Sequence, residues 1–320
     1  MSLYIGIDTS NYTTSVAIYN SDLKKVIHKK QLLPVKQGER GIRQSDAVFH
    51  HTAQISKLMD ELLLECKREW GIKDFSSLKA IGVSSRPRNV KGSYMPCFTV
   101  GMSVAHSLST ALGVPCYEFS HQEGHVVAAL YSAGKLDLLN TSFLAFHVSG
   151  GTTESLIATP TDSGVPTIKL IGTSTDLKAG QAIDRIGVML GLRFPCGRQL
   201  EELALKSDKD YKIKPSTKGF DCSLSGVENK CKKMFELHEK PEDIALFCLK
   251  YIEASLESMA GALLKEYKGY HILFSGGVMS NSIIRNDFKK KFDCSFAAPE
   301  FSSDNAAGVS ILASIMDYKG

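Results

Sequence analysis

The spacing of apolar residues predicts a chain in which short strands and amphipathic helices alternate. Short β-branched runs between Gly, Ser and Thr turns favour strands, whereas apolar residues three or four positions apart favour helices. In the first part we expect strands at 3–8, 14–20, 24–33, 79–84 and 114–118, a charged loop at 36–41, and helices at 45–66, 98–112 and 122–133. In the second part we expect strands at 143–149, 154–159, 167–172, 271–275 and 294–298, with helices at 179–191, 226–237, 241–267, 280–291 and 304–318.

The second half of the chain repeats the pattern of the first. Residues 5–18, Ile-Gly-Ile-Asp-Thr-Ser-Asn-Tyr-Thr-Thr-Ser-Val-Ala-Ile, return one residue shorter at 146–158 as Phe-His-Val-Ser-Gly-Gly-Thr-Thr-Glu-Ser-Leu-Ile-Ala. A duplicated unit of this kind folds as two lobes whose mixed sheets are flanked by helices around a central cleft. We therefore expect an α/β protein with a lobe at 1–134 and a lobe at 135–320. This plan resembles the actin-like ATPase fold of actin, Hsp70 and sugar kinases.

Length and composition fit a soluble two-lobed protein. Each half of the 320 residues is long enough to bury its own core, and 43% hydrophobic with 22% charged residues is ordinary for globular chains. We expect no membrane span, because no run of roughly 18 apolar residues occurs. Met1-Ser-Leu leads directly into a strand without a secretion signal, so we expect a cytoplasmic location. The net charge of +4 permits nucleic-acid binding without indicating it.

Two histidines and one aspartate form a candidate metal site. His121 and His125 stand four residues apart at a helix start, so their rings share one face. In isolation such a pair is more often a packed or surface pair than a ligand set. The duplication brings Asp304 of the second lobe to the matching strand end, which favours the metal interpretation. Two histidines and one carboxylate leave open positions and suit zinc or ferrous iron.

A metallopeptidase is the least favoured function for this histidine pair. Glu123 lies two residues from either histidine, on a different helix face from the general base of His-Glu-x-x-His peptidases. Asp8, in the first polar turn, either orients a metal-bound water or caps its turn. We include Asp8 with His121, His125 and Asp304 among the candidate catalytic residues.

Glycine turns at strand ends in the second lobe are candidates for binding a nucleotide. Their backbone N–H groups can approach a phosphate closely, although each turn alone could equally be structural. Asp184 lies opposite the apolar face of its predicted helix, where it either bonds a ribose or remains solvated. The candidate nucleotide residues include Ser149, Gly150, Gly151, Asp184, Gly276 and Asn281.

Together these motifs resemble the threonylcarbamoyladenosine synthase family of tRNA-modifying proteins, formerly called O-sialoglycoprotein endopeptidases. The motifs run in the family's order nearly end to end: Gly6-Ile-Asp-Thr-Ser10, His121-Gln-Glu-Gly-His125, Val148-Ser-Gly-Gly151, Gly180-Gln-Ala-Ile-Asp184, Phe274-Ser-Gly-Gly-Val-Met-Ser-Asn281 and Ser303-Asp-Asn-Ala-Ala307. The resemblance implies metal ligands at His121, His125 and Asp304. It implies an adenylate site at His147, Val148, Ser149, Gly150, Gly151, Asp184, Gly197 and Asn281. It also implies transfer of threonylcarbamoyl from its adenylate to the N6 amine of the anticodon-adjacent adenosine of tRNA, within a multi-protein complex.

The chain departs from the family pattern at several polar positions. Tyr12 and Thr13 replace an Asp-Glu pair, Thr152 replaces a histidine, Gln44 and Gln181 replace glutamates, Leu177 and Lys178 replace an aspartate and an alanine, and Arg86-Pro-Arg88 replaces Gly-Pro-Gly. The loss of carboxylates and gain of cations favours a more anionic ligand. The alternatives to transfer are therefore a nucleotide-binding regulatory module without activity, and an ATP-dependent transferase with a more anionic substrate.

If Arg86 and Arg88 clamp a phosphate or carboxylate, replacing both with alanine should weaken binding of anionic nucleotides, because bidentate guanidinium contacts are lost. Titration of ATP, AMP and polyphosphorylated nucleotides into wild type and the double variant measures this. Equal affinities would show that the two arginines belong to a solvated basic loop.

Overall fold

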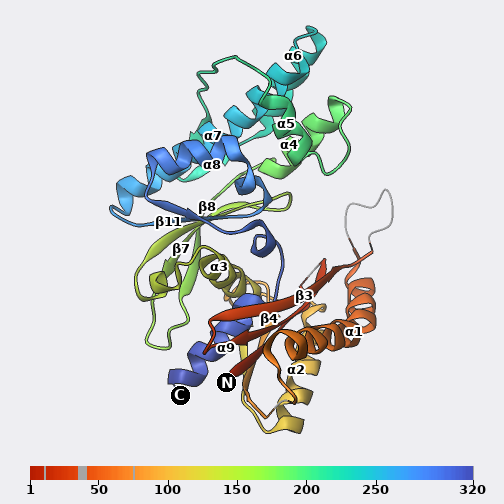
Figure 1. The fold of residues 1–320 in the computed structure, drawn as a ribbon. Helices are drawn as coiled ribbons and strands as arrows, with labels where there is room; N and C mark the ends of the chain where they lie inside the picture. The colour runs from red at the N-terminus through yellow and green to blue at the C-terminus, as the bar shows by residue number, and fades with distance from the viewer. Residues whose placement is uncertain (11, 35–41, 75, 320) are drawn as a thin grey trace. The chain divides into compact units, whose positions relative to one another are not determined.

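The chain divides into two compact units. The computed structural model describes residues 1–10, 12–34, 42–74 and 76–319 (Figure 1), so the charged loop expected at 36–41 lies outside the described residues. Unit 1 comprises Met1–Thr141, Thr159–Ile168 and Glu300–Gly320, and unit 2 comprises Ser142–Ala158 and Lys169–Pro299. This division differs from the single boundary predicted after residue 134. The chain's last segment, including Asp304, belongs to unit 1 because its helix packs on the first sheet.

Unit 1 is built on a five-stranded mixed sheet of order β3-β2-β1-β4-β5. The antiparallel pairs are β3–β2 and β2–β1, and the parallel pairs are β1–β4 and β4–β5. Its elements are β1 (Leu3–Asp8), β2 (Thr13–Asn20), β3 (Lys25–Leu32), α1 (Gln44–Trp70), β4 (Leu78–Arg86), α2 (Phe98–Leu112), β5 (Cys116–Ser120), α3 (His121–Ser132), the 3-10 helices η1 (Leu136–Asn140) and η3 (Pro299–Phe301), and α9 (Ala307–Lys319).

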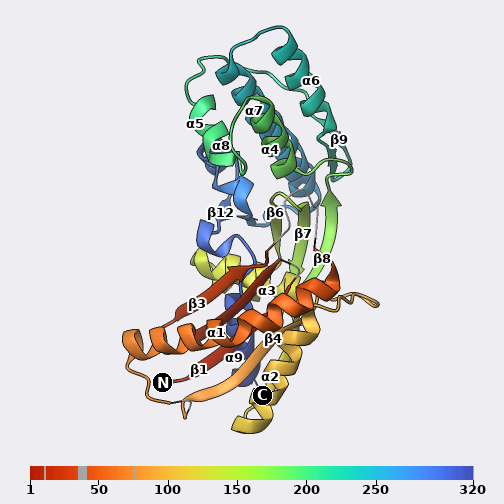
Figure 2. The same cartoon turned by 90° about the vertical axis from the view of Figure 1, so that its right-hand side faces the viewer.

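Helices from both ends of the chain pack on this sheet. Helix α1 packs on β2 and β3 and α2 on β4, whereas α9 packs on β1, β2 and β4 and also on α3. Figures 1 and 2 show the dark blue α9 beside the red N-terminal strands. All six residues of β1 are buried, since the strand is central and covered on both faces.

Unit 2 repeats the sheet of unit 1. Its order is β12-β11-β6-β7-β8, so β6, β7, β8, β11 and β12 take the places of β1 to β5. This confirms the duplication seen in the sequence. Its elements are β6 (Phe143–Val148), β7 (Thr153–Thr159), β8 (Thr167–Thr173), α4 (Ala179–Met189), α5 (Gly197–Ala204), β9 (Ser216–Lys218), β10 (Asp221–Ser223), α6 (Ser225–Glu236), α7 (Pro241–Glu266), β11 (Ile272–Ser275), the 3-10 helix η2 (Gly277–Ser280), α8 (Ser282–Lys291) and β12 (Cys294–Phe296).

The predicted elements differ from the observed ones mainly at their ends. Strand β5 runs two residues later than expected, because Pro115 follows directly on the turn after α2. Helix α9 begins at Ala307 and not at 304, because the Asn305 side chain caps it by accepting from the Ala307 amide at 3.1 Å. The sequence did not predict α5 or the β9–β10 hairpin.

Two glycines bring α3 and α9 into backbone contact. A β-carbon added at Gly308 would overlap the carbonyl oxygen of Gly124, so α9 cannot carry a side chain at this crossing without moving, whereas a β-carbon at Gly124 would lie 3.0 Å from a Val309 methyl group. Gly124 lies between His121 and His125, and Gly308 follows Asp304 by four residues. The crossing therefore sets the distance between the histidine pair and the segment that carries the aspartate.

We expect Gly308→Ala to lower the free energy of unfolding of unit 1 by about 1–3 kcal/mol, because the added methyl overpacks this crossing. Trp70 is the chain's single tryptophan and lies in unit 1, so its fluorescence during urea denaturation reports the change. Gly261→Ala in α7 is the control, since its new β-carbon would have nothing within 4 Å. Equal midpoints for Gly308→Ala and wild type would contradict the close contact.

Candidate functional site

Asp8 ends the central strand β1 and is 1% exposed. One carboxylate oxygen, Oδ1, accepts from the Ser10 amide at 2.8 Å and so caps the polar turn. The other, Oδ2, accepts from the Ser84 hydroxyl at 2.5 Å and lies 2.7 Å from Nδ1 of His121. Asp8 therefore caps its turn, which is one of the two roles expected from the sequence. Its carboxylate also holds the ring of His121.

A capping box fixes the start of the histidine helix. The Ser120 hydroxyl accepts from the Glu123 amide at 3.2 Å, and the Glu123 carboxylate accepts from the Ser120 amide at 2.6 Å. Glu123 is 3% exposed and also accepts from the Asn89 amide group at 3.2 Å. The Glu123 carboxylate is therefore used to cap the helix. This agrees with the expectation that a metallopeptidase is the least favoured function.

His121, His125 and Asp304 meet in unit 1. Nε2 of His125 lies 3.0 Å from Asp304 Oδ1, and Nε2 of His121 lies 3.5 Å from the same oxygen. The two ring centroids are 4.2 Å apart. Each residue offers one ligand atom, and these three atoms all lie within 4.8 Å of one another. The trio predicted from the sequence is therefore assembled.

The geometry of this trio fits a tetrahedral metal ion. Ligand atoms about 2.1 Å from zinc at tetrahedral corners are about 3.4 Å apart, close to the two histidine–aspartate separations. Metal-bound histidines usually hold a carboxylate with their second nitrogen, which fixes the ring orientation. His121 has this arrangement, because Asp8 contacts Nδ1 and leaves Nε2 toward Asp304.

The charges around His121 are strongly coupled. Burial acts to lower the pKa of His121, but the carboxylates of Asp8 and Asp304 outweigh it and raise that pKa to about 10. Burial opposes ionisation of Asp8, yet the charge and hydrogen bond of His121 hold its pKa below the usual value. Burial likewise acts on Asp304, and hydrogen bonds from His121 and His125 bring its pKa well below the usual range. The site is thus built to hold positive charge between two carboxylates.

Other polar side chains around this trio were not foreseen from the sequence. Thr13 donates to Asp304 Oδ2 at 3.3 Å, at a position where the sequence indicated only a lost carboxylate. Ser84 was not singled out, although a polar residue at the end of an apolar strand is a recognisable signal. Lys30 gave no local signal, because its contacts are with residues 270 or more positions away.

The candidate nucleotide residues gather at strand ends in unit 2. Gly180 donates its amide to the Ser149 carbonyl at 3.1 Å, and a β-carbon there would lie 2.6 Å from the Gly150 nitrogen. Gly276 has a φ of +96°, and a β-carbon would overlap the Val148 carbonyl. These glycines let the start of α4 and the end of β11 approach the turn at 148–151.

The remaining candidates hold the starts of α5 and α8 or contact a neighbouring strand. Asp184 accepts from the Cys196 amide at 2.8 Å, which places it beside Gly197 at the start of α5. Asn281 caps α8 by accepting from the Ile284 amide at 3.2 Å. His147 lies with Nδ1 3.1 Å from the Ser275 hydroxyl. Asp184 is therefore not a purely solvated helix charge, because it also holds the chain before α5.

Several of the family departures form local hydrogen bonds, whereas Leu177 is buried in the hydrophobic core of unit 2. Gln44 accepts from the Cys97 amide at 3.2 Å, and Gln181 accepts from the Lys178 amide at 3.4 Å. Thr152 donates its amide to the Ser149 hydroxyl at 3.1 Å. Arg86 donates to the Ser85 hydroxyl at 2.8 Å and to Asn89 Oδ1 at 3.0 Å, which leaves its role as an anion clamp a prediction.

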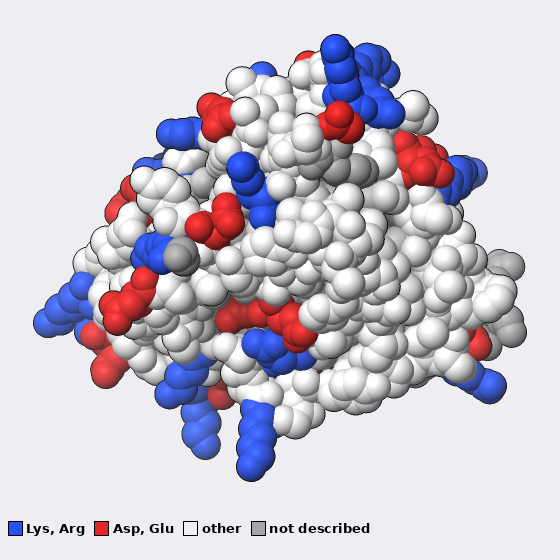
Figure 3. All heavy atoms as spheres, turned by 90° about the horizontal axis from the view of Figure 1, so that it is seen from below, with Lys and Arg blue, Asp and Glu red and all other residues white. Residues whose placement is uncertain are grey.

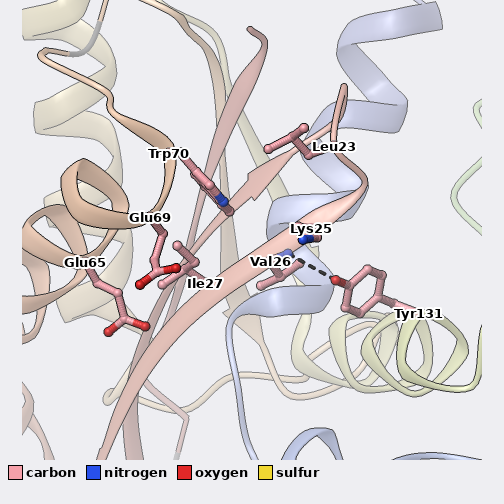
Figure 4. Close-up of a pocket in the computed structure, with 8 residues that line it drawn as sticks. All are labelled: Leu23, Lys25, Val26, Ile27, Glu65, Glu69, Trp70 and Tyr131. Atoms are coloured by element: carbon pink, nitrogen blue, oxygen red, sulfur yellow. Dashed lines mark hydrogen bonds between the residues drawn. The ribbon is translucent and has the colours of Figure 1, made fainter.

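A separate cavity of about 360 Å³ opens between β3, the end of α1 and Tyr131 (Figure 4). Glu65, Glu69 and Trp70 come from the end of α1, and Lys25, Val26 and Ile27 come from β3. None of its lining residues belongs to the candidate metal or nucleotide sets. This cavity does not contribute to the site.

The molecular surface gives little sign of nucleic-acid binding on the face seen from below. Figure 3 shows Lys and Arg side chains interspersed with acidic ones over its left and upper parts and near the middle, and a wide uncharged area toward the right. The described part of this face thus lacks a continuous basic stripe of the kind that marks such binding. Among the described residues, no helix is both long and apolar enough to cross a membrane.

Comparison with known sequences identifies the family of this chain. A family model described as TsaD, tRNA N6-adenosine threonylcarbamoyltransferase, matches residues 23–311. A protein of that name from Kosmotoga olearia is 30% identical over 323 residues, which cover 97% of this chain and 92% of the relative. Another from Nautilia profundicola is 28% identical over 330 residues, with 99% and 94% coverage.

Solved structures share the fold at low sequence identity. HypF from T. kodakarensis superposes with a TM-score of 0.62 at 13% identity, covering 99% of this chain and 47% of that chain. Component A of the (R)-2-hydroxyglutaryl-CoA dehydratase of Acidaminococcus fermentans gives 0.56 at 15% identity, covering 99% and 100%. These likenesses confirm the predicted actin-like ATPase fold. With a family model matched over most of its length, the chain belongs to the TsaD family of tRNA N6-adenosine threonylcarbamoyltransferases.

Proposed function

We propose that this chain transfers threonylcarbamoyl from its adenylate to the N6 amine of the adenosine beside the anticodon of tRNA, using a metal held by His121, His125 and Asp304. The observation that carries the proposal is the meeting of three ligand atoms within 4.8 Å from residues far apart in the sequence. Family membership supplies the reaction, and the trio supplies the centre at which it takes place.

The donor set suits zinc or ferrous iron, because two imidazoles and one carboxylate leave open coordination positions. When bound, the metal supplies a Lewis acid toward a carbonyl or phosphoryl oxygen. Asp8 orients the His121 ring through Nδ1, and Thr13 orients Asp304 through a hydrogen bond to Oδ2. Asp8, His121, His125 and Asp304 are the residues to which we assign catalysis.

Unit 2 binds the adenylate in this proposal. Ser149, Gly150 and Gly151 form a turn without β-carbons at two positions, so a phosphate can approach the backbone N–H groups. His147, Val148, Asp184, Gly197, Gly276 and Asn281 complete the assigned set. The RNA amine forms the bond to the carbamoyl carbon while the bond from that carbon to the phosphate oxygen breaks, and AMP leaves.

The strongest competing function is a nucleotide-binding regulatory module that has lost transfer. Thr13 contacts Asp304 at a position where the family carries an acidic residue, which favours this alternative. A third candidate function is that of an ATP-dependent transferase with a more anionic substrate. We propose adenine nucleotide, tRNA and the proteins of a tRNA-modifying complex as partners of this chain, and a cytoplasmic location.

We expect His121→Ala to abolish stoichiometric metal binding and Asp8→Asn to weaken it about 10–100-fold, because the first loses a ligand and the second loses the group that orients one. Metal analysis of purified protein and competition with a chelator measure both effects. His106→Ala is the control, since His106 also contacts a carboxylate, Glu118 at 3.0 Å, but lies on the exposed face of α2. A wild type that binds no metal would demote the trio to packing residues.

We expect wild type to turn over threonylcarbamoyl-adenylate on tRNA many times per molecule when its complex partners are present. Asp304→Asn should reduce turnover at least about 100-fold, because a charged ligand is lost, while AMP binding in unit 2 persists. Transfer of labelled threonine to tRNA and calorimetric titration of AMP distinguish the functions. Stoichiometric AMP binding by wild type without turnover would favour the regulatory module.

A further inference from the structure

The segment that carries Asp304 is held at defined points on both sides of this residue. On the C-terminal side, the Ala306 amide donates to the Ser15 hydroxyl of β2 at 2.9 Å. Within the segment, the buried Asn305 side chain donates to the Ser303 carbonyl at 2.7 Å. The Asn305 side chain also donates to the Phe301 carbonyl at 3.3 Å, so these contacts brace the segment internally, and other groups tie the residues before Asp304 to the sheet.

Strand β3 supplies those other groups. The Lys30 ammonium donates to the Glu300 carbonyl at 2.9 Å and to the Ser303 hydroxyl at 2.7 Å. His28, two residues earlier on the same face of the strand, lies with Nε2 2.7 Å from Glu300 Oε1. Its ring stacks on Phe301 with centroids 5.0 Å apart and an interplanar angle of 8°. Residues 300, 301 and 303 are therefore all anchored to β3.

The geometry points to Lys30 as a positioning residue for the metal centre, because its two hydrogen bonds hold residues 300 and 303 and so place the Asp304 carboxylate against His121 and His125. This inference rests on the proposed function. Asp304 is tied from both sides, by Lys30 through Ser303 and by Ser15 through Ala306. Lys30 supplies the hydrogen bond from β3 that reaches the residue directly before the aspartate.

A second effect of Lys30 opposes the first. The ammonium is close enough to Asp304 for their charges to interact, so it would repel a bound cation. Positioning and repulsion therefore predict opposite results when the charge and the donor are removed together. Loss of positioning weakens metal binding, whereas loss of repulsion alone strengthens it. The sign of the change decides between them.

The test compares Co²⁺ and Zn²⁺ affinity in Lys30→Met, Lys30→Arg and Ser303→Ala. We expect Lys30→Met to bind both metals about 10–100-fold more weakly, as for loss of a group that orients a ligand. The visible absorption of bound Co²⁺ should also change, because it reports ligand geometry. Lys30→Arg, which keeps both charge and donors, should restore most of the affinity. Ser303→Ala removes the acceptor of one Lys30 hydrogen bond without changing any charge. We expect it to weaken metal binding, as Lys30→Met does.

Lys29→Met is the matched control. Lys29 directly precedes Lys30 in β3, and it forms an ion pair with Glu65 of α1 on the other side of the strand. A metal affinity in Lys30→Met equal to or above that of wild type overturns the inference, as does an equal loss in Lys29→Met. If Lys30→Met does not fold, Ser303→Ala decides alone. Wild type that binds neither metal overturns the proposed metal centre as well, whereas normal wild-type binding with unaffected variants overturns only the role of Lys30.

Discussion

The contact between Gly124 of α3 and Gly308 of α9 is the constraint on which the candidate site depends. It joins the helix that carries both histidines to the helix that follows the aspartate, at a distance that requires glycine at position 308. Metal–ligand bonds of about 2.0–2.2 Å tolerate little error in the positions of their donors. A β-carbon at Gly308 would overlap the Gly124 carbonyl oxygen, so a side chain there would force the two helices apart. The packing of unit 1 therefore sets the site's geometry before any polar contact refines it.

The charges of Asp8 and Asp304 then determine that the site requires a positively charged group between them. Two carboxylates, Asp8 and Asp304, approach His121 from its two ring nitrogens, and desolvated carboxylates require compensation. A protonated imidazole supplies part of that compensation, and a divalent cation would supply it with the ring neutral. Because Asp8 is tied by Ser10 and Ser84 as well, the charge cannot be relieved by moving the aspartate away. Removal of either carboxylate would change the protonation of His121 together with its orientation.

The sequence predicted local and repeated features well, and it failed where contacts join distant segments. Strands such as β1 and helices such as α2 carry their own apolar spacing. The duplication grouped Asp304 with the histidines, but as a residue of the second lobe, whereas its segment belongs to unit 1. Helix α5 was missed because eight residues hold barely two turns of periodicity, and the strands of the β9–β10 hairpin are only three residues each. The assignment of α9 to unit 1 and the role of Lys30 depend on contacts with the opposite end of the chain. No local pattern contains that information.

The polar turns after β1 and β6 occupy equivalent positions in the two sheets but differ in the charge of their side chains. In the first copy Asp8 ends β1, and Ser84 at the end of β4 donates to it. In the second copy Ser149 follows β6 at the position of Asp8, two glycines come next, and Ser275 on the strand equivalent to β4 contacts His147. Replacing the carboxylate by a hydroxyl removes the negative charge, and the glycines leave backbone N–H groups accessible, so we expect the second turn to suit an anion where the first suits a cation. The two sheets keep the same strand order although these turn residues differ.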